Sequence, residues 1–259
     1  MRKIAIANQK GGCGKTTTAV NLSAALAAKG RRVLIVDLDP QAHTTLGLGY
    51  DPDQLTKTIY DILVNAQVSL ATVIMQTSIK GLELAPSNVL LSGAELELAT
   101  QIGRELILNR RLSSIEANYD VCIIDCSPSL GLLTLNALVA GTDVIVPVQV
   151  HYYAMEGLRQ LLQTIDIVKS RFNPDLKMAG ILLTFVEDRT LLSKDVQRQM
   201  REFFGDLVFD TVIRKSVRLA EAPSAGEPVI TYDVSSRATC EYLTLADEVT
   251  NGETKGRPT

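Results

Sequence analysis

Two lysines stand close together near the start of the chain, in the stretch "NQKGGCGKTTT". The stretch ends in Gly14, Lys15 and Thr16, as the phosphate-binding pattern G-x-x-x-x-G-K-[ST] does, but Gln9 replaces the first glycine of that pattern. Lys10 lies inside the loop as an additional cation. A glycine-rich turn before a helix exposes backbone N–H groups to phosphate, and Lys15 would reach the β- and γ-phosphates. The stretch therefore predicts a nucleotide site and leaves the second lysine to be explained.

The residues predicted to surround the phosphates form one continuous run, and the Thr16 hydroxyl is expected on Mg²⁺. The run is Lys10, Gly11, Gly12, Cys13, Gly14, Lys15, Thr16 and Thr17. Carboxylates follow two further apolar runs, with Asp37 and Asp39 in "DLDPQ" and Asp125 at the end of "VCIID". In P-loop nucleotidases a carboxylate at the position of Asp125 holds Mg²⁺, usually through water. Of the other two, one could serve only to orient the loop.

The elements that must position these residues alternate along the chain. Apolar, β-branched runs at 3–8, 32–37, 82–86, 121–125, 144–148 and 180–185 predict strands, and segments at 15–29, 92–117, 153–171, 190–204 and 236–250 predict helices. Strands that are apolar on both faces and alternate with helices indicate a mainly parallel sheet covered on both sides. We expect one doubly wound α/β domain over residues 1–250, followed by a polar, disordered tail at 251–259.

Composition sets limits on function. The chain has 259 residues, 46% of them hydrophobic and 21% charged, and a net charge of -3, so any nucleic-acid binding must come from a local basic patch. The four cysteines are too scattered for a disulfide framework, and neither a signal peptide nor an apolar run of about 20 residues is present. A cytoplasmic protein is expected. The two histidines, His43 and His151, have no companion ligands at metal-binding spacing, and neither is expected to bind a metal.

The motifs together resemble those of a known family. "KGGCGKTT", "VDLDPQ" and "IIDCSPSLGLLTLNAL" look like the deviant Walker-A ATPases, and most closely the ParA/Soj family that partitions chromosomes and plasmids. "PVQVHYYAMEGLRQLL", "GILLTFVEDRT" and "VRLAEAPSAGEPVITYD" are also similar to that family, so the resemblance covers roughly residues 3–250. It implies a P-loop fold, slow hydrolysis of ATP with Mg²⁺, and an ATP-dependent homodimer.

The resemblance also assigns roles to individual residues. Lys10 matches a lysine that reaches across the dimer interface to the nucleotide of the other subunit, where it would offset the repulsion between two ATP molecules. Asp39 matches the residue that handles the attacking water, and Asp37 and Asp125 match the magnesium shell. Lys10, Lys15 and Asp39 are therefore the predicted catalytic residues.

Basic residues in the second half of the chain predict a DNA surface. Arg189 and Arg218 match family positions that contact DNA, and Arg214 and Lys215 lie in "VIRKSVRL", where relatives usually read "VIPRNVRL". The missing proline changes the backbone that would cradle the adenine base. A helical set of Lys194, Arg198 and Arg201 is by default a solvated face. Binding should be to double-stranded DNA without sequence preference, because no recognition helix or zinc module is present.

The family further implies a ParB-like partner that stimulates hydrolysis and a location on the nucleoid. Since the chain begins at its first strand, we expect no operator-binding extension. The main alternative is a MinD-like, membrane-associated division-site ATPase, but that relative ends in a basic amphipathic helix, whereas this chain ends in a short polar tail. An iron–sulfur protein of the nitrogenase branch and a non-catalytic scaffold are weaker alternatives. Cys122 and Cys126 do not follow the cluster pattern, and the residues of the nucleotide site are all present.

Overall fold

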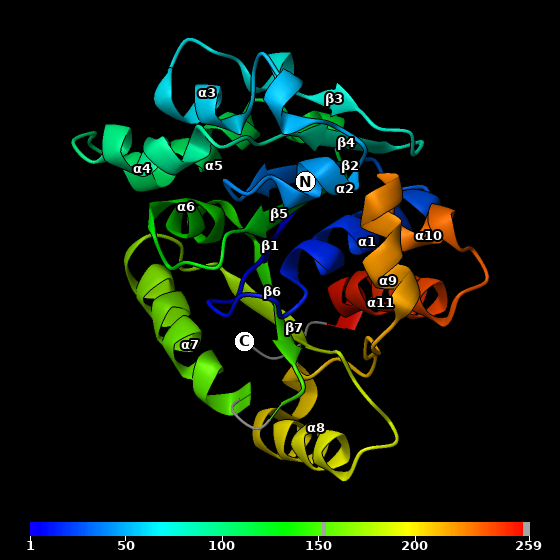
Figure 1. The fold of residues 1–259 in the computed structure, drawn as a ribbon. Helices are drawn as coiled ribbons and strands as arrows, with labels where there is room; N and C mark the ends of the chain where they lie inside the picture. Colours follow the sequence, from blue (N-terminus) through cyan, green and yellow to red (C-terminus); the bar gives the residue numbers. More distant parts are fainter. Residues whose placement is uncertain (152–153, 256–259) are drawn as a thin grey trace.

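A single mainly parallel sheet forms the centre of the computed structural model, which describes residues 1–151 and 154–255 (Figure 1). Within these residues, seven strands pair in the order β3-β4-β2-β5-β1-β6-β7. Only the β3–β4 pair is antiparallel. The strands are β1 (Arg2–Ile6), β2 (Val33–Leu38), β3 (Met75–Gln76), β4 (Leu82–Ala85), β5 (Val121–Cys126), β6 (Asp143–Gln149) and β7 (Lys177–Thr184). The predicted fold class is confirmed.

Helices cover both faces of the sheet. They are α1 (Lys15–Ala28), α2 (His43–Gly47), α3 (Ile59–Val64), α4 (Leu91–Leu98), α5 (Ile107–Ser113), α6 (Leu132–Ala140), α7 (Ala154–Arg171), α8 (Leu191–Phe204), α9 (Val217–Glu221), α10 (Val229–Tyr232) and α11 (Arg237–Lys255). Two cores result, because successive side chains of each strand point to opposite faces. Ile4 and Ile6 pack in the core under α1, α10 and α11, whereas Ala5 packs in the core under α3 to α8.

The expected helix at 92–117 is wrong as a single element. The structure divides it into α4 and α5, with the short 3₁₀ helix η3 (Arg104–Leu106) before α5. Helix α4 already ends at Leu98, and Gly103, with φ at 71° in the left-handed region, directly precedes η3. The closing helix also runs to Lys255 and not to 250, and it continues through Asn251 and Gly252 although both are weak helix formers. Residues 251–255 of the expected polar tail lie inside this helix, and residues 256–259 lie outside the described residues.

The carboxyl ends of the central strands meet at one edge, as a parallel sheet requires. Asp37 on β2 and Asp125 on β5 are register partners, and Ile6 at the end of β1 pairs with the same Asp125. The glycine-rich loop leaves β1 at this edge and enters α1 (Figure 1). Among the described residues, no helix is both long enough and apolar enough to cross a bilayer.

Candidate functional site

The loop between β1 and α1 has the backbone that its glycines predict. Gly12 and Gly14 have φ of 69° and 89°, conformations that side-chain-bearing residues rarely adopt. The sheet holds the loop in place, because the Thr184 hydroxyl donates to the Cys13 carbonyl at 2.8 Å and the Asn8 amide donates to the Pro147 carbonyl at 2.7 Å. The loop N–H groups therefore lie at the positive end of α1, where they can bind phosphate.

The two lysines of the loop differ in burial and direction. Lys15 is 6% exposed, and its Nζ donates to the Lys10 carbonyl oxygen at 3.0 Å, so its ammonium lies within the loop. The Lys10 side chain is exposed, and its Nζ donates to Oε1 of Gln149, the last residue of β6, at 3.3 Å. The same Nζ contacts His151 Nε2 just beyond that strand. Lys15 is thus placed to serve the nucleotide of its own loop, whereas Lys10 extends across the loop surface.

Two buried threonines hold the neighbouring carboxylates of Asp37 and Asp125. The Thr45 hydroxyl and backbone N–H both donate to Asp37 Oδ2, at 2.7 and 2.9 Å. The Thr44 hydroxyl donates to Asp125 Oδ2 at 2.7 Å. Adjacent strands are about 4.8 Å apart, so the structure brings two acidic groups together in a dry site.

This arrangement raises the pKa of both carboxyls. Burial, and then the charge of Asp125, raises the pKa of Asp37 to about 7. Burial raises the pKa of Asp125 to about 6, against the opposing effect of the Thr44 and Thr16 hydroxyls. Asp125 Oδ1 is buried without a hydrogen-bond partner. A divalent cation would satisfy this oxygen and neutralise the pair, so the residues fit Mg²⁺ held by Thr16, Asp37 and Asp125.

Asp39 lies just beyond these carboxylates and is 7% exposed. Its Oδ1 accepts the Gln41 backbone N–H at 3.0 Å, and its carbonyl accepts the Ser87 hydroxyl at 2.8 Å. Within the described residues, Asp39 Oδ2 has no hydrogen-bond partner. The carboxylate is therefore oriented by one oxygen, and the other is available to a water molecule.

Sequence reasoning assigned no role to Thr44 and Thr45, which anchor the two carboxylates. They lie on α2, a helix of five residues that begins after Ala42, whose φ of 53° is left-handed. A signal was present in the sequence, since "HTT" follows "DLDPQA" and places two hydroxyl side chains shortly after the strand-end carboxylates. The left-handed turn at Ala42 brings the following hydroxyls back toward the strand ends.

A cleft of about 740 Å³ opens beside Thr16 and Thr17 and is also lined by α2 and residues 222–227. Its size lies within the range of small-molecule sites. Gly226 and Gly49 both line the cleft and pack closely together, since a Cβ on Gly226 would lie 2.7 Å from the Gly49 Cα. The cleft adjoins the phosphate loop and therefore extends the nucleotide site.

The predicted DNA residues are all at least partly exposed but differ in their partners. Arg214 pairs with Asp188 and Glu241, Lys215 with Glu187, and Arg218 with Glu221 and Asp233. Arg189 is exposed and has no acidic partner among the described residues. The helical set behaves as a solvated face in part, since Arg198 pairs with Asp195 and Glu202 along α8.

The close pair of carboxylates leads to a stability prediction for Asp125→Asn. Both folded-state pKa values lie above the ordinary carboxyl value, so ionisation destabilises the ligand-free protein as the pH rises through about 4 to 7. At pH 8 the amide should therefore stabilise the ligand-free protein by about 1 kcal/mol, since it removes a buried charge and still accepts from Thr44. Thermal unfolding with and without Mg²⁺-ADP checks this.

With Mg²⁺-ADP present the order of stability should reverse, because the variant loses a group that holds the cation. An Asp125→Asn protein that is less stable than the parent without nucleotide would contradict the destabilising charge pair. An Asp125→Asn protein that gains as much thermal stability from Mg²⁺-ADP as the parent would contradict the magnesium role.

Comparison with known proteins agrees with this geometry. A family model described as an AAA domain matches residues 1–178. The chain is 50% identical over 246 residues to the sporulation initiation inhibitor protein Soj of Bacillus subtilis, covering 95% of this chain and 97% of the relative. It is 47% identical over 257 residues to the chromosome partitioning protein ParA of Myxococcus xanthus, covering 99% and 90%.

A solved structure from Mycobacterium smegmatis, described as cobyrinic acid a,c-diamide synthase with bound ADP and magnesium, superimposes with a TM-score of 0.87. It is 40% identical and covers 99% of this chain and 97% of that chain. Its description names an amide-forming activity, whereas the two relatives that are more similar in sequence are named for sporulation and chromosome partitioning. The predicted cofactors, ATP and Mg²⁺, are confirmed. From the loop, the acidic edge and these similarities together, we conclude that the chain belongs to the ParA/Soj family of P-loop partition ATPases.

Proposed function

We propose that the protein is an ATP-dependent dimeric switch that binds DNA without sequence preference and positions a chromosome, a plasmid or another cargo. The observation that carries the proposal is the division between the two lysines of the loop. Lys15 is buried and directed into its own loop, whereas Lys10 is exposed at the loop surface. Two facing ATP molecules repel each other strongly, and a lysine donated by each subunit to the other would offset that repulsion.

Hydrolysis would reset the switch. The geometry of Asp39 supports a role in orienting the attacking water, since one carboxylate oxygen is fixed by Gln41 and the other has no partner in the described part of the chain. Thr16, Asp37 and Asp125 would hold Mg²⁺, which supplies charge neutralisation at the phosphates. We propose that turnover is slow and that a ParB-like partner stimulates it.

The DNA surface would include Arg189 and Arg218, with Lys215 beside them. Val186 and Arg214 form an isolated parallel β-bridge. The segment after β7 and the segment before α9 therefore lie side by side at the edge of the sheet. Each monomer offers a modest patch on a protein of net charge -3. A dimer links two patches, which multiplies avidity without any new type of contact, so the nucleotide state can control DNA binding.

These properties would keep the protein in the cytoplasm on the nucleoid and away from the membrane. The MinD-like alternative predicts binding to anionic vesicles in the presence of ATP. Vesicle flotation separates the two functions, because a partition ATPase should stay with DNA and leave the vesicles unbound.

Replacing Arg218 by alanine tests the DNA surface. Affinity for DNA with ATP should fall by a similar factor on two unrelated duplexes, because phosphate contacts carry no sequence information. Arg218 pairs with Glu221 and Asp233 at the surface, and such exposed pairs are weak enough to exchange for phosphate. In a salt titration, the log–log slope should decrease by about one for each phosphate that the variant no longer neutralises.

Arg198→Ala is the matched control, since it removes the same charge from an exposed ion pair on α8 and should change the slope less. An unchanged Arg218→Ala protein would exclude this residue from the surface. Strong preference of the parent protein for one duplex would contradict non-specific binding.

A further inference from the structure

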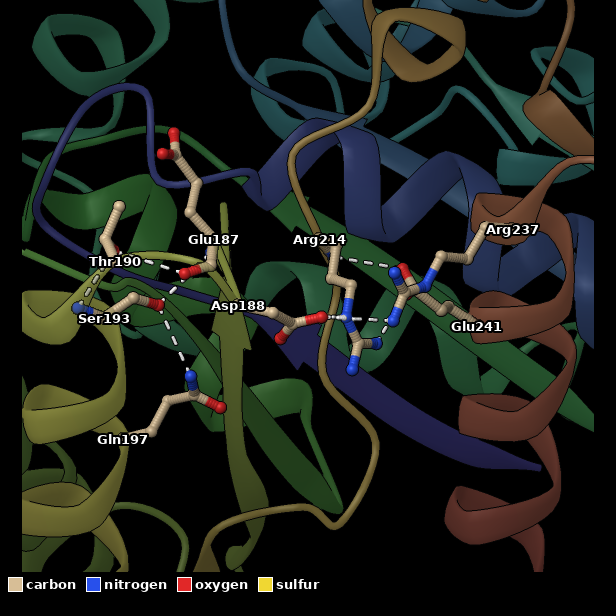
Figure 2. A network of polar contacts seen from close by, with 8 residues as sticks. All are labelled: Glu187, Asp188, Thr190, Ser193, Gln197, Arg214, Arg237 and Glu241. Atoms are coloured by element: carbon tan, nitrogen blue, oxygen red, sulfur yellow. Dashed lines mark hydrogen bonds and ion pairs between the residues drawn. The ribbon is translucent and has the colours of Figure 1, made fainter.

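A network of charged side chains joins the turn after β7 to helix α11 (Figure 2). Arg214 is at its centre. Its Nε donates to Asp188 Oδ2 at 2.6 Å, and its Nη1 and backbone N–H donate to the two carboxylate oxygens of Glu241, at 2.8 and 3.0 Å. Arg237 reinforces both acidic partners, with Nη2 at 3.3 Å from Asp188 Oδ2 and Nε at 3.1 Å from Glu241 Oε1. Two guanidinium groups thus face two carboxylates.

The network neutralises Arg214. Its side chain is 28% exposed, and the Glu241 side chain is 9% exposed, so this half of the network is largely shielded from water. The Arg214 hydrogen bond is the main cause that lowers the pKa of Asp188, which keeps that carboxylate charged. A phosphate would have to displace carboxylates that already satisfy the guanidinium fork, so Arg214 is poorly placed to bind DNA itself.

The turn that carries Asp188 is also fixed to helix α8. The Thr190 hydroxyl accepts the Ser193 backbone N–H at 3.3 Å and caps the helix, while the Ser193 hydroxyl accepts the Glu187 backbone N–H at 3.2 Å (Figure 2). On the other side, the Lys215 backbone N–H donates to the Val186 carbonyl at 3.2 Å. Hydrogen bonds to α8 on one side and to the segment before α9 on the other therefore hold the turn in place.

Arg189 lies within this turn, directly after Asp188. It is exposed, and in residues 1–151 and 154–255 it has neither an ion pair nor a side-chain hydrogen bond. The same strand exit also contacts the nucleotide loop, because Thr184 donates to the Cys13 carbonyl. The turn thus connects the loop that binds phosphate to a surface cation that has no acidic partner in these residues.

We propose that Arg214 is a positioning residue, which holds Asp188 and thereby the turn that presents Arg189 to DNA phosphates, and that it does not bind DNA directly. The inference rests on the proposed DNA binding and assigns Arg214 a different role from that of Arg189 and Arg218.

The variant Asp188→Asn separates the two roles by the sign of its effect. If Arg214 were a phosphate ligand, removing the charge of an acidic partner would free its guanidinium and strengthen DNA binding. If Arg214 positions the turn, the weakened ion pair should reduce affinity for DNA about five-fold, although the protein has become less negative. The measurement is DNA binding with saturating ATP, by fluorescence anisotropy on a labelled duplex, after sedimentation has shown that the variant still dimerises.

Asp195→Asn is the matched control, because it makes the same charge change in an exposed pair with Arg198 on α8. It should leave binding unchanged or slightly stronger. A second variant, Arg214→Gln, should weaken binding in the parent background but little further in an Arg189→Ala background, because it acts through Arg189. A direct phosphate ligand would add its own loss in both backgrounds.

If the parent protein binds DNA, either of two results would overturn this inference alone. One is an Asp188→Asn variant that binds more tightly, and the other is an Arg214→Gln substitution that weakens binding equally in the parent and Arg189→Ala backgrounds. Parent protein that fails to bind DNA with ATP would overturn the proposed function and the inference with it.

Discussion

Lys15→Ala protein should bind ATP about 100-fold more weakly or not at all, whereas Lys10→Ala protein should bind ATP as a monomer and dimerise at least about ten-fold more weakly than the parent. The two lysines are five residues apart, but only Lys15 is buried inside the loop. Its ammonium donates a hydrogen bond to the Lys10 carbonyl oxygen. Removing Lys15 takes away the cation that faces the β- and γ-phosphates of the bound nucleotide.

Removing the Lys10 side chain affects a different step. Its ammonium contacts Gln149 and His151 in this single chain, and the backbone carbonyl that accepts from Lys15 is unchanged by the substitution. Nucleotide affinity of the monomer should therefore stay within about two-fold of the parent. The ATP dimer should be weakened about ten-fold or more, because the facing triphosphates lose their compensating cations.

Fluorescent-nucleotide titration measures the first property and sedimentation velocity with Mg²⁺-ATP measures the second. A Lys10→Ala protein that dimerises as well as the parent would exclude a role for this lysine across the interface. A Lys15→Ala protein with normal nucleotide affinity would place the phosphate site elsewhere.

The second large effect is expected from Asp39→Ala, which should hydrolyse ATP about 100-fold more slowly and accumulate a long-lived dimer. The substitution removes the carboxylate that would orient water but no predicted phosphate contact. The turn itself should survive, because the Asp39 backbone carbonyl still accepts the Ser87 hydroxyl and the Ala42 N–H.

Single-turnover hydrolysis and sedimentation with Mg²⁺-ATP check this prediction together. Near-normal hydrolysis by the Asp39→Ala protein would move the water-positioning role elsewhere, with Asp37 the next candidate. Asp37 is less suited to that role, since one of its oxygens accepts two hydrogen bonds from Thr45 and the other accepts the Asp39 N–H.

The parts of the site that are local in sequence could be predicted from the sequence. The loop glycines, Lys15 and the strand-end carboxylates belong to short motifs whose geometry follows from a strand, a turn and a helix. The parallel register then brings Asp37 and Asp125 side by side without further information. The apolar, β-branched runs also predict six of the seven strands in the described sheet, but not the two-residue antiparallel strand β3 at its edge.

The parts that depend on distant contacts could not be predicted in this way. Thr44 reaches Asp125 across 81 residues, and Arg214 reaches Glu241 across 27, so neither pairing has a local signature. The division of the expected helix 92–117 includes a left-handed backbone conformation at Gly103, which a single glycine permits but does not require. Charged residues on the surface show their sign in the sequence but not their partners.

The central claim is that ATP joins two chains and that the dimer binds DNA. Sedimentation velocity of the wild-type protein with a labelled duplex tests it most directly, with Mg²⁺ and either a hydrolysis-resistant ATP analogue or ADP. We predict a dimer that carries the duplex with the ATP analogue, and a monomer that leaves the duplex free with ADP. A protein that stays monomeric with both nucleotides, or that carries the duplex equally well with ADP, would contradict the account.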